Sequence, residues 1–474
     1  MQPTAVMGTV GSRIGCSVVS LVTGVIAARH LGAVGRSHLA VVLSVAGLFG
    51  IMGLLGLDTA NLRFASRSTA AFRQLVRWSV RFSLVGGTVL PALWWLAGQW
   101  FPVARLGLNP RLALVGVALC PVTAAVALLG TAQIGRGRPV SFGLVNAGTA
   151  VVYLAGVLAL ALAGKITVTG CAVSYGAGQL AGVIALLAMA LWRSRPEGDT
   201  VRIREYRAYA FRAYLPNVAQ YGMLRMDVPI IQLLTGTTAV ALYAIALPIA
   251  EGLMLLPIAV ATIMFPRVTA GTVRRVQSVR VAWAVFAGTL VAAAALGVVA
   301  PVFVPWAYGS VFRGSVGVIW CMLPGLVIFS AGRVAQTYLS ATDRLRQVTV
   351  ASAAGVIAGV AALAVLAPRF GADGAGAADS VGYLGYTAFM LWGLRAPRGD
   401  SRFSLGLRGP RSLRSGRRRI TSAATPTAPP REAAGAPTAV KSGAAALARA
   451  SRAALARVAG VTTAVTTAVI AFVS

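Results

Sequence analysis

Eight ionisable residues lie inside apolar stretches that are long enough to cross a lipid bilayer. A charged side chain at the centre of a membrane costs at least about 2.5–3.5 kcal/mol unless it faces a partner or water. Such residues are therefore candidates for binding or coupling sites. They are Arg13, Asp58, Arg81, Arg225, Asp227, Glu251, Arg333 and Asp379.

Two of these charges stand in one short stretch, YGMLRMDVPIIQLLTG. Arg225 and Asp227 are two residues apart, which places them on nearly opposite sides of a helix, so each needs its own partner. Pro229 has no N–H and leaves the carbonyl of Arg225 without a helical partner, so we expect a kink there. A broken helix with charges near the midplane is a usual place for the binding or coupling site of a transporter.

Five of the eight charges are expected deeper in the membrane, and three of these five are arginines. The five are Arg13, Arg225, Asp227, Glu251 and Arg333. Arginine offers paired donors that match phosphate oxygens, so this balance favours an anionic substrate in a cavity. We assign Arg13, Arg225 and Arg333 to substrate binding. Asp227 and Glu251 are assigned to a coupling cation or proton. The structural alternative is a buried ion pair of Asp227 with Arg13 or Arg333.

The elements that position these charges are membrane spans. Of the 474 residues, 57% are hydrophobic and 11% are charged, and the mean hydropathy is +0.77, far from the composition of soluble proteins. The pattern predicts an all-α polytopic membrane protein with about twelve spans. Arg81 and Asp379 are expected near span ends, where side chains reach the interface. The predicted spans are residues 9–28, 39–61, 78–98, 112–132, 141–164, 168–192, 213–235, 240–264, 281–304, 316–339, 347–368 and 375–394.

Arginines are concentrated in alternate connections between the spans. The connections after spans two, four, six, eight and ten are rich in arginine, and the others contain few basic residues. We call these the arginine-rich and arginine-poor sides. The positive-inside rule predicts that the arginine-rich side and both termini are cytoplasmic. The net charge of +32 is then mainly a signal of topology, and it does not indicate a nucleic-acid partner.

The chain also divides into two similar halves. The segments starting at residues 30 and 131 resemble those starting at 234 and 335, a shift of about 205 residues. Two six-helix lobes around a central cavity are therefore expected. The predicted parts are a first lobe (1–195), a cytoplasmic connection (196–212), a second lobe (213–396) and a basic, disordered cytoplasmic tail (397–474) that attracts anionic lipids. The run after Val458 is marginally long, and a surface helix and a weak thirteenth span both stay open for it.

Motifs for enzymatic chemistry and for cofactors are missing from the sequence. Lys165 and Lys441 are the only lysines, and neither lies in a phosphate-binding GxxxxGK[ST] loop. GxSxG and HExxH are absent, and the four cysteines lie in different spans without metal-ligand spacing. We therefore expect no enzyme activity, no cofactor and no metal site. Transport must then be driven by an ion gradient, the membrane potential or mass action.

The opening of the chain carries a family pattern. GSRIGCSVVSLVTGVIAARHLGAVG followed by GLLGLDTANLRFASR resembles the bacterial polysaccharide and O-antigen flippases of the multidrug/oligosaccharidyl-lipid/polysaccharide exporter superfamily. In the second half, Asp227 and Tyr243, FPRV after span eight and YLSATDRLR after span ten also fit that pattern. The resemblance covers about residues 8–394. The matching positions of the first half are Arg13, Arg29, Leu31, Gly32, Gly56, Leu57, Ala60, Arg63 and Phe64.

This resemblance implies two helical lobes around a cationic cavity. It also implies movement of undecaprenyl-diphosphate-linked oligosaccharide across the bacterial cytoplasmic membrane, for cell-surface polysaccharide assembly. The expected partners are this lipid-linked anionic oligosaccharide and a glycosyltransferase or polymerase of the same pathway. Because lysines are almost absent, the cations of the cavity must be arginines, and the basic tail lies outside the family pattern.

Three alternatives stay open at this point. The related peptidoglycan-precursor flippases normally carry two further spans, of which only the weak run after Val458 remains here. Drug/cation antiporters of the same superfamily typically have more acidic cavities. A membrane scaffold that recruits glycosyltransferases through the arginine-rich tail is the alternative from a different class of protein.

Overall fold

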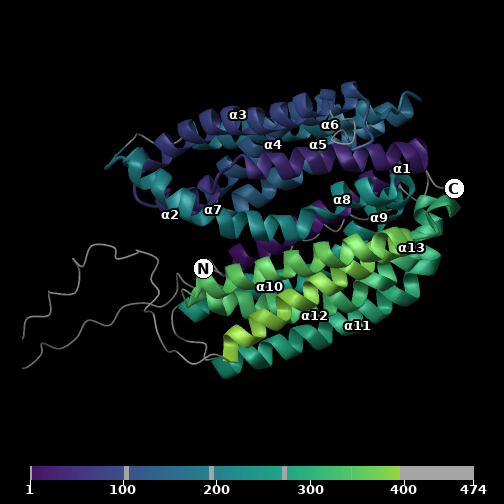
Figure 1. The fold of residues 1–474 in the computed structure, drawn as a ribbon. Helices are drawn as coiled ribbons and strands as arrows, with labels where there is room; N and C mark the ends of the chain where they lie inside the picture. The colour runs from purple at the N-terminus through teal and green to yellow at the C-terminus, as the bar shows by residue number, and fades with distance from the viewer. Residues whose placement is uncertain (1–2, 101–105, 192–196, 270–274, 343, 396–474) are drawn as a thin grey trace, which may run out of the picture. The chain divides into compact units, whose positions relative to one another are not determined.

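The computed structural model describes residues 3–100, 106–191, 197–269, 275–342 and 344–395, so the predicted tail lies outside the described residues (Figure 1). Within these ranges the regular structure is entirely helical, which confirms the predicted fold class. Two short 3-10 helices, Gly252–Met254 and Ser310–Phe312, add to the α-helices. The α-helices are α1 (Pro3–Met52), α2 (Leu57–Phe64), α3 (Thr69–Trp100), α4 (Pro110–Gly135), α5 (Pro139–Leu162), α6 (Val168–Leu191), α7 (Ile203–Arg225), α8 (Asp227–Thr235), α9 (Thr237–Glu251), α10 (Leu255–Thr269), α11 (Arg275–Tyr308), α12 (Ser315–Ala341) and α13 (Leu345–Arg395).

Nine helical segments in the described ranges are long and apolar enough to cross a membrane, so the chain is a multi-pass membrane protein. Two of them each contain two predicted spans. The 50 residues of α1 would be about 75 Å long if straight, more than twice the thickness of a bilayer core. The backbone of α1 is non-helical at Gly32, and that of α13 at Gly371. With α7 and α8 as one interrupted span, the predicted total of twelve is reached.

The two arms of α13 fold back on each other. A Cβ atom at Gly382 would lie 3.1 Å from the carbonyl oxygen of Gly355, and one at Gly385 would lie 3.2 Å from Cβ of Ala358. These contacts join the two arms on either side of the turn at Gly371, as in a helical hairpin. The missing side chains allow the backbones of the two arms to approach closely.

Span two was predicted to run unbroken over residues 39–61, and this is wrong. Helix α1 ends at Met52, a turn covers residues 53–56, and α2 begins at Leu57. Leu55 and Gly56 have φ angles of 49° and 78°, which an α-helix cannot contain. Asp58 therefore lies in a short separate helix and not within a long span.

Every connection on the arginine-poor side contains a glycine with positive φ. Glycine adopts this conformation without the strain that a Cβ would add. Gly32 and Gly236 also share an extended ψ, with φ/ψ of 65°/−172° and 82°/−168°. The glycines pair between the two halves at separations of 204, 202 and 207 residues, in agreement with the repeat of about 205 residues. The pairs are Gly32 with Gly236, Gly107 with Gly309, and Gly164 with Gly371.

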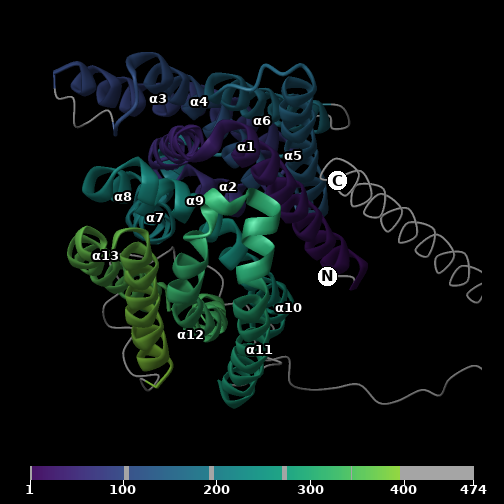
Figure 2. The ribbon, with the colours of Figure 1, turned by 90° about the vertical axis from the view of Figure 1, so that its right-hand side faces the viewer.

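The helices of the two halves are grouped in space. In Figure 2, α3, α4, α5 and α6 lie on one side and α10, α11, α12 and α13 on the other, and Figure 1 shows the same separation. Helices α1, α7, α8 and α9 lie between the two groups in both views. These central helices carry most of the deeper charged residues.

Alanine at Gly236 is expected to lower the free energy of unfolding by about 1–3 kcal/mol, the strain of a backbone conformation that only glycine adopts readily. A Cβ there would meet nothing within 4 Å, so the effect is purely one of backbone conformation. Gly148 is the matched control, because it lies in α5 and also has free space around it. Unfolding of the purified protein measures both, and equal losses for the two alanine variants would contradict the interpretation.

Candidate functional site

Span seven is broken at the charged stretch. Helix α7 ends at Arg225, α8 begins at Asp227, and Met226 between them is outside both helices. The break lies where Pro229 withholds an N–H from the carbonyl of Arg225, so the predicted kink is confirmed.

Span eight is also interrupted, and at a charged residue. Helix α9 ends at Glu251, a 3-10 turn follows, and α10 begins at Leu255. Nη2 of Arg225 lies 3.6 Å from Oε2 of Glu251, so the two breaks are joined by an ion pair. The side chains are 49% and 30% exposed, so the described residues do not bury the pair. Sequence reasoning named both residues and gave them separate roles, whereas the structure brings them together.

Behind this pair, a tyrosine links two carboxyl groups. The hydroxyl of Tyr243 lies 2.9 Å from Oδ2 of Asp227 and 2.7 Å from Oδ2 of Asp379. Tyr243 is fully buried, and Asp379 is only 9% exposed. The phenol has one hydrogen and donates to one carboxylate at a time. The second contact is a hydrogen bond only if the other carboxyl is protonated and donates to the phenol oxygen. Both contacts are hydrogen bonds together only when one of the two carboxyl groups is protonated.

This cluster corrects two expectations. Asp379 was expected near the end of its span, with its side chain at the interface, but it is buried and hydrogen-bonded in the second arm of α13. Asp227 was given Arg13 or Arg333 as a possible ion-pair partner, and its hydrogen-bond partner is Tyr243. The pairing of Tyr243 with Asp379 has no local sequence signal, since the two residues are 136 positions apart.

Arg13 and Arg333 form a second, separate group of charges. Arg13 is exposed on α1, and Arg333 is half-buried on α12. Nη1 of Arg333 donates to Oε1 of Gln336 at 2.7 Å. The two ion pairs found in the described part of the chain involve neither arginine, so this cationic pair has no carboxylate partner there. Such a pair in an apolar segment favours binding of an anion.

The predicted cationic residues lie at two depths. At 1.5 Å per helical residue, Arg13 is about 28 Å from the turn at Gly32, and Arg333 is about 27 Å from the start of α12 at Ser315. Arg225 is only about 17 Å from the turn at Gly236. Arg13 and Arg333 therefore lie at a similar depth toward the arginine-rich side, and Arg225 lies deeper, beside Glu251.

On the arginine-poor side, two arginines that flank the turn at Gly32 donate hydrogen bonds to the second half of the chain. Nε of Arg29 donates to the carbonyl of Ala307 at 2.7 Å, and its Nη2 donates to the carbonyl of Trp306. Both carbonyls are in the last turn of α11, where helical partners are missing. Nη2 of Arg36 donates to the carbonyl of Ala244 at 3.0 Å. That carbonyl is free because Pro248 stands four residues later. These bonds hold the two halves together on this side.

Asp58 has a partner near the arginine-rich side. Nδ2 of Asn217 in α7 donates to both carboxylate oxygens, at 2.9 and 3.1 Å, and to Oγ1 of Thr59 at 2.8 Å. These bonds join α2 to the first part of span seven. Asp58 is thus a packing contact between elements, distinct from the charges at the breaks.

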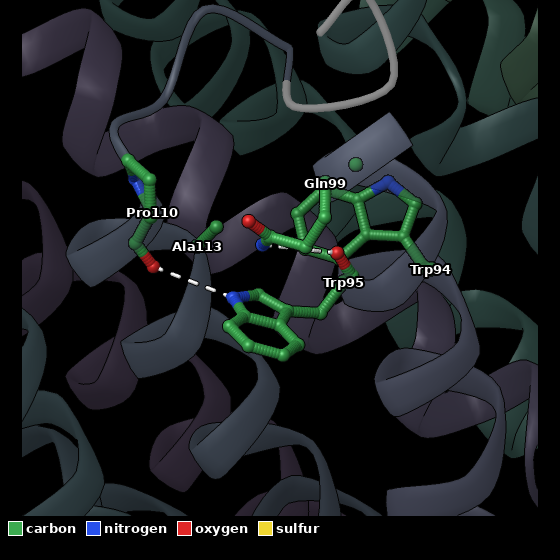
Figure 3. A pocket seen from close by; sticks show the side chains of 6 residues that line it. Trp94, Trp95, Gln99, Pro110 and Ala113 are labelled. Atoms are coloured by element: carbon green, nitrogen blue, oxygen red, sulfur yellow. Dashed lines mark hydrogen bonds between the residues drawn. The ribbon is translucent and has the colours of Figure 1, made fainter. Parts of the chain in front are cut away.

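One pocket lies apart from all these charges. It is lined by Trp94, Trp95, Gly98, Gln99, Pro110 and Ala113, between the end of α3 and the start of α4 (Figure 3). Nε1 of Trp95 donates to the carbonyl of Pro110 across it. Its empty volume is about 180 Å³, but it is too narrow to admit a water molecule, so it is not a ligand site. Groups of three or more residues that could hold a metal are absent from the described residues.

The sequence matches no protein-family model and no curated protein. Solved structures nevertheless share the fold. An inward-facing multidrug resistance MATE transporter of the MOP superfamily aligns with a TM-score of 0.63 and 13% identity, over 80% of this chain and 93% of that chain. The lipid II flippase MurJ in an inward closed conformation gives 0.61 and 12%, over 81% and 87%. The MATE multidrug transporter DinF-BH gives 0.60 and 12%, over 83% and 95%.

At this level of identity the likeness concerns the fold. The chain has the all-helical, two-lobe fold of these membrane proteins, with twelve spans. The similar structures include both multidrug transporters and a lipid II flippase.

The protonated cluster predicts how substitutions affect stability. Phenylalanine at Tyr243 leaves two buried carboxyl groups without their bridge and should lower the free energy of unfolding by about 1–3 kcal/mol. An amide imitates a protonated carboxyl, so either Asp227→Asn or Asp379→Asn should be tolerated with a change below about 1 kcal/mol. Thermal unfolding compares the three variants. Two amide variants as unstable as Tyr243→Phe would show that the cluster is not protonated.

Loss of the Arg29 bonds should open the arginine-poor side. Cysteine at Ala28, which is fully buried, reports on this opening in a background without the four native cysteines. Two charge-assisted bonds of about 1.5–3 kcal/mol each predict that Arg29→Gln raises the rate of modification by a membrane-impermeant thiol reagent at least about ten-fold. Arg111→Gln, at an exposed arginine on the same side, is the control and should leave the rate unchanged. Equal rates in all variants would mean that Arg29 does not hold this side closed.

Proposed function

We propose that this chain is a flippase that moves an undecaprenyl-diphosphate-linked oligosaccharide across the bacterial cytoplasmic membrane by alternating access. The observation that carries the proposal is the cationic pair of Arg13 and Arg333. The two arginines belong to different halves of the chain, lie at the same depth and have no carboxylate partner among the described residues. A diphosphate offers the charge and the oxygen geometry that paired guanidinium groups bind.

Arg225 provides a second position for the same anionic group. Its ion pair with Glu251 is partly exposed and has an N–O distance of 3.6 Å, so an incoming phosphate can compete with the carboxylate. A diphosphate that leaves Arg13 and Arg333 would meet Arg225 about 11 Å deeper. Substrate binding by these three arginines is therefore part of the proposal.

A proton gradient is the proposed driving force. Asp227, Tyr243 and Asp379 share one proton in the arrangement described above, and Glu251 lies at the neighbouring break. Loss of that proton would leave two buried carboxylates that repel each other, so the local structure must differ between the two protonation states. Asp227 and Glu251 are accordingly proposed as coupling residues, together with Asp379.

The proposed arrangement in the membrane follows the arginines. Both termini and the arginine-rich connections are cytoplasmic, by the positive-inside rule. Residues 1–195 and 213–396 form the two lobes, 196–212 connect them, and 397–474 form a cytoplasmic tail that contacts anionic lipids. A polymerase or glycosyltransferase that handles the same oligosaccharide is the proposed protein partner, and the chain itself catalyses no chemical reaction.

Two other substrates have support of their own. The likeness to MurJ favours a peptidoglycan lipid precursor, which would use the same arginines for its diphosphate. The carboxyl cluster and the likeness to MATE transporters favour a cationic drug in exchange for protons. The cationic pair opposes this second alternative, since the positive charges of Arg13 and Arg333 would repel an organic cation.

The test is leaflet-resolved transport in proteoliposomes. A fluorescent undecaprenyl-diphosphate oligosaccharide is supplied, and an impermeant quencher reports how much has changed leaflet. Removal of two charged hydrogen-bond donors predicts that Arg13→Gln/Arg333→Gln lowers the rate at least about ten-fold. The control Arg275→Gln/Arg280→Gln removes two exposed arginines at the start of α11 and should retain the wild-type rate.

Separate arms distinguish the alternatives. A fluorescent peptidoglycan lipid precursor and an organic cation replace the oligosaccharide under the same proton gradient. If either probe changed leaflet faster than the oligosaccharide, that probe would represent the substrate and the proposed substrate would be wrong. Rates that are equal with and without the gradient, or unaffected by Asp227→Asn, would remove the proton from the mechanism. Folded wild-type protein that moves none of the three probes would contradict the flippase proposal itself.

A further inference from the structure

The connection between the halves is bound along α3. The N–H of Ala70 donates to the carbonyl of Glu197 at 3.1 Å. The amide of Gln74 makes two bonds to the backbone of Val201: its Nε2 donates to the carbonyl at 3.1 Å, and its Oε1 accepts from the N–H at 2.8 Å. The connection between residues 197 and 201 is therefore bound to the first turns of α3.

Aromatic contacts continue this alignment into α7. The rings of Trp78 and Tyr206 have centroids 5.2 Å apart. The guanidinium of Arg207 lies over the ring of Phe82, 5.6 Å from its centroid. Successive turns of α3 thus face successive positions of the connection and α7, which brings the start of α7 beside the first part of α3.

Four exposed arginines are close to these contact positions in the sequence or take part in them. Arg77 and Arg81 are one turn apart on α3, adjacent in sequence to the contact positions Trp78 and Phe82, and both are exposed. Arg204 and Arg207 are exposed within the first two turns of α7. We call these four residues the basic patch.

Carboxylates do not neutralise the basic patch. The ion pairs found among the described residues involve none of its arginines. Glu205 is the nearest acidic residue in the sequence, but its Oε1 lies 2.8 Å from Nη2 of Arg67. The hydrogen bond from Arg67 lowers the pKa of Glu205, so this carboxylate stays ionised and bound to a residue outside the patch. The four arginines of the patch thus have no ion-pair partner among the described residues, and Arg207 also lies over the ring of Phe82.

An exposed apolar surface adjoins the patch. Leu84 and Val85 follow Arg81 by about one turn on α3 and are 56% and 62% exposed. Phe211 follows Arg207 by one turn on α7 and is 76% exposed. Charged groups at the level of the bilayer interface with apolar groups one turn deeper match the two parts of a phospholipid, whose headgroup lies above its acyl chains.

We propose that the basic patch binds the phosphodiester headgroup of an anionic phospholipid, whose acyl chain packs on the exposed face of α3. Charge complementarity selects an anionic lipid, because four unneutralised arginines repel a net cation and gain little from a zwitterion. The site lies on the outer surface of the helices and is separate from the charges at the two helix breaks. Its existence does not depend on the identity of the transported substrate.

The test uses the full chain in phosphatidylcholine vesicles that contain a small amount of photoreactive phosphatidylglycerol. Peptide mapping after illumination locates the labelled residues. We expect labelling of residues 77–85 and 203–211, and much less with photoreactive phosphatidylcholine. Each arginine near the surface contributes about a five-fold factor in affinity, so Arg81→Gln/Arg207→Gln should lower the labelling at least about five-fold.

Two controls make the outcome decisive. Arg275→Gln/Arg280→Gln removes the same charge from exposed residues of α11 and should retain the labelling. Arg81→Lys/Arg207→Lys keeps the charge and should retain most of it, which separates headgroup binding from a loss of folding. Equal loss in the α11 variant would reduce the effect to general attraction by net charge and overturn the site. Preferential labelling by photoreactive undecaprenyl diphosphate, with phosphatidylglycerol excluded, would overturn the assignment to a phospholipid.

Discussion

Inside a bilayer, a polar group that lacks water must find its partner within the protein, and the central helices of this chain follow from that constraint. Proline removes one N–H from span seven, and the span breaks where the carbonyl of Arg225 loses its partner. Span eight breaks at Glu251, and the two breaks meet through an ion pair. The irregular backbone and the charged side chains are thus found at the same place.

The same constraint explains the contacts on the arginine-poor side. Proline at position 248 frees the carbonyl of Ala244, and the end of α11 leaves the carbonyls of Trp306 and Ala307 without helical partners. Arg36 and Arg29 donate to these groups. Bonds of this kind require no acidic residue, which suits a chain with 43 basic and 11 acidic residues. They also join the two halves of the chain on the arginine-poor side.

Two kinds of charged site result, and they differ in how they are neutralised. Asp227 and Asp379 are linked through Tyr243, so a proton held between them would neutralise this site from within the protein. Arg13 and Arg333 have no acidic partner among the described residues, so their counterion must come from outside. A site of the first kind suits a coupling proton, and a site of the second kind suits an anionic cargo.

The sequence by itself determined the features that depend on neighbours along the chain. Hydropathy and length predicted the spans, and Pro229 predicted the break after Arg225. The sidedness that the arginine counts indicate stays a prediction. Tertiary structure decided which charges meet, because partners on different helices depend on packing and rotation that no local pattern encodes. Tyr243 and Asp379 are 136 residues apart, and Arg29 and Ala307 are 278 apart. Asp379 was misplaced for a different reason, the position of a helix boundary: its helix continues to the turn at Gly371, so the residue lies about 12 Å from that turn.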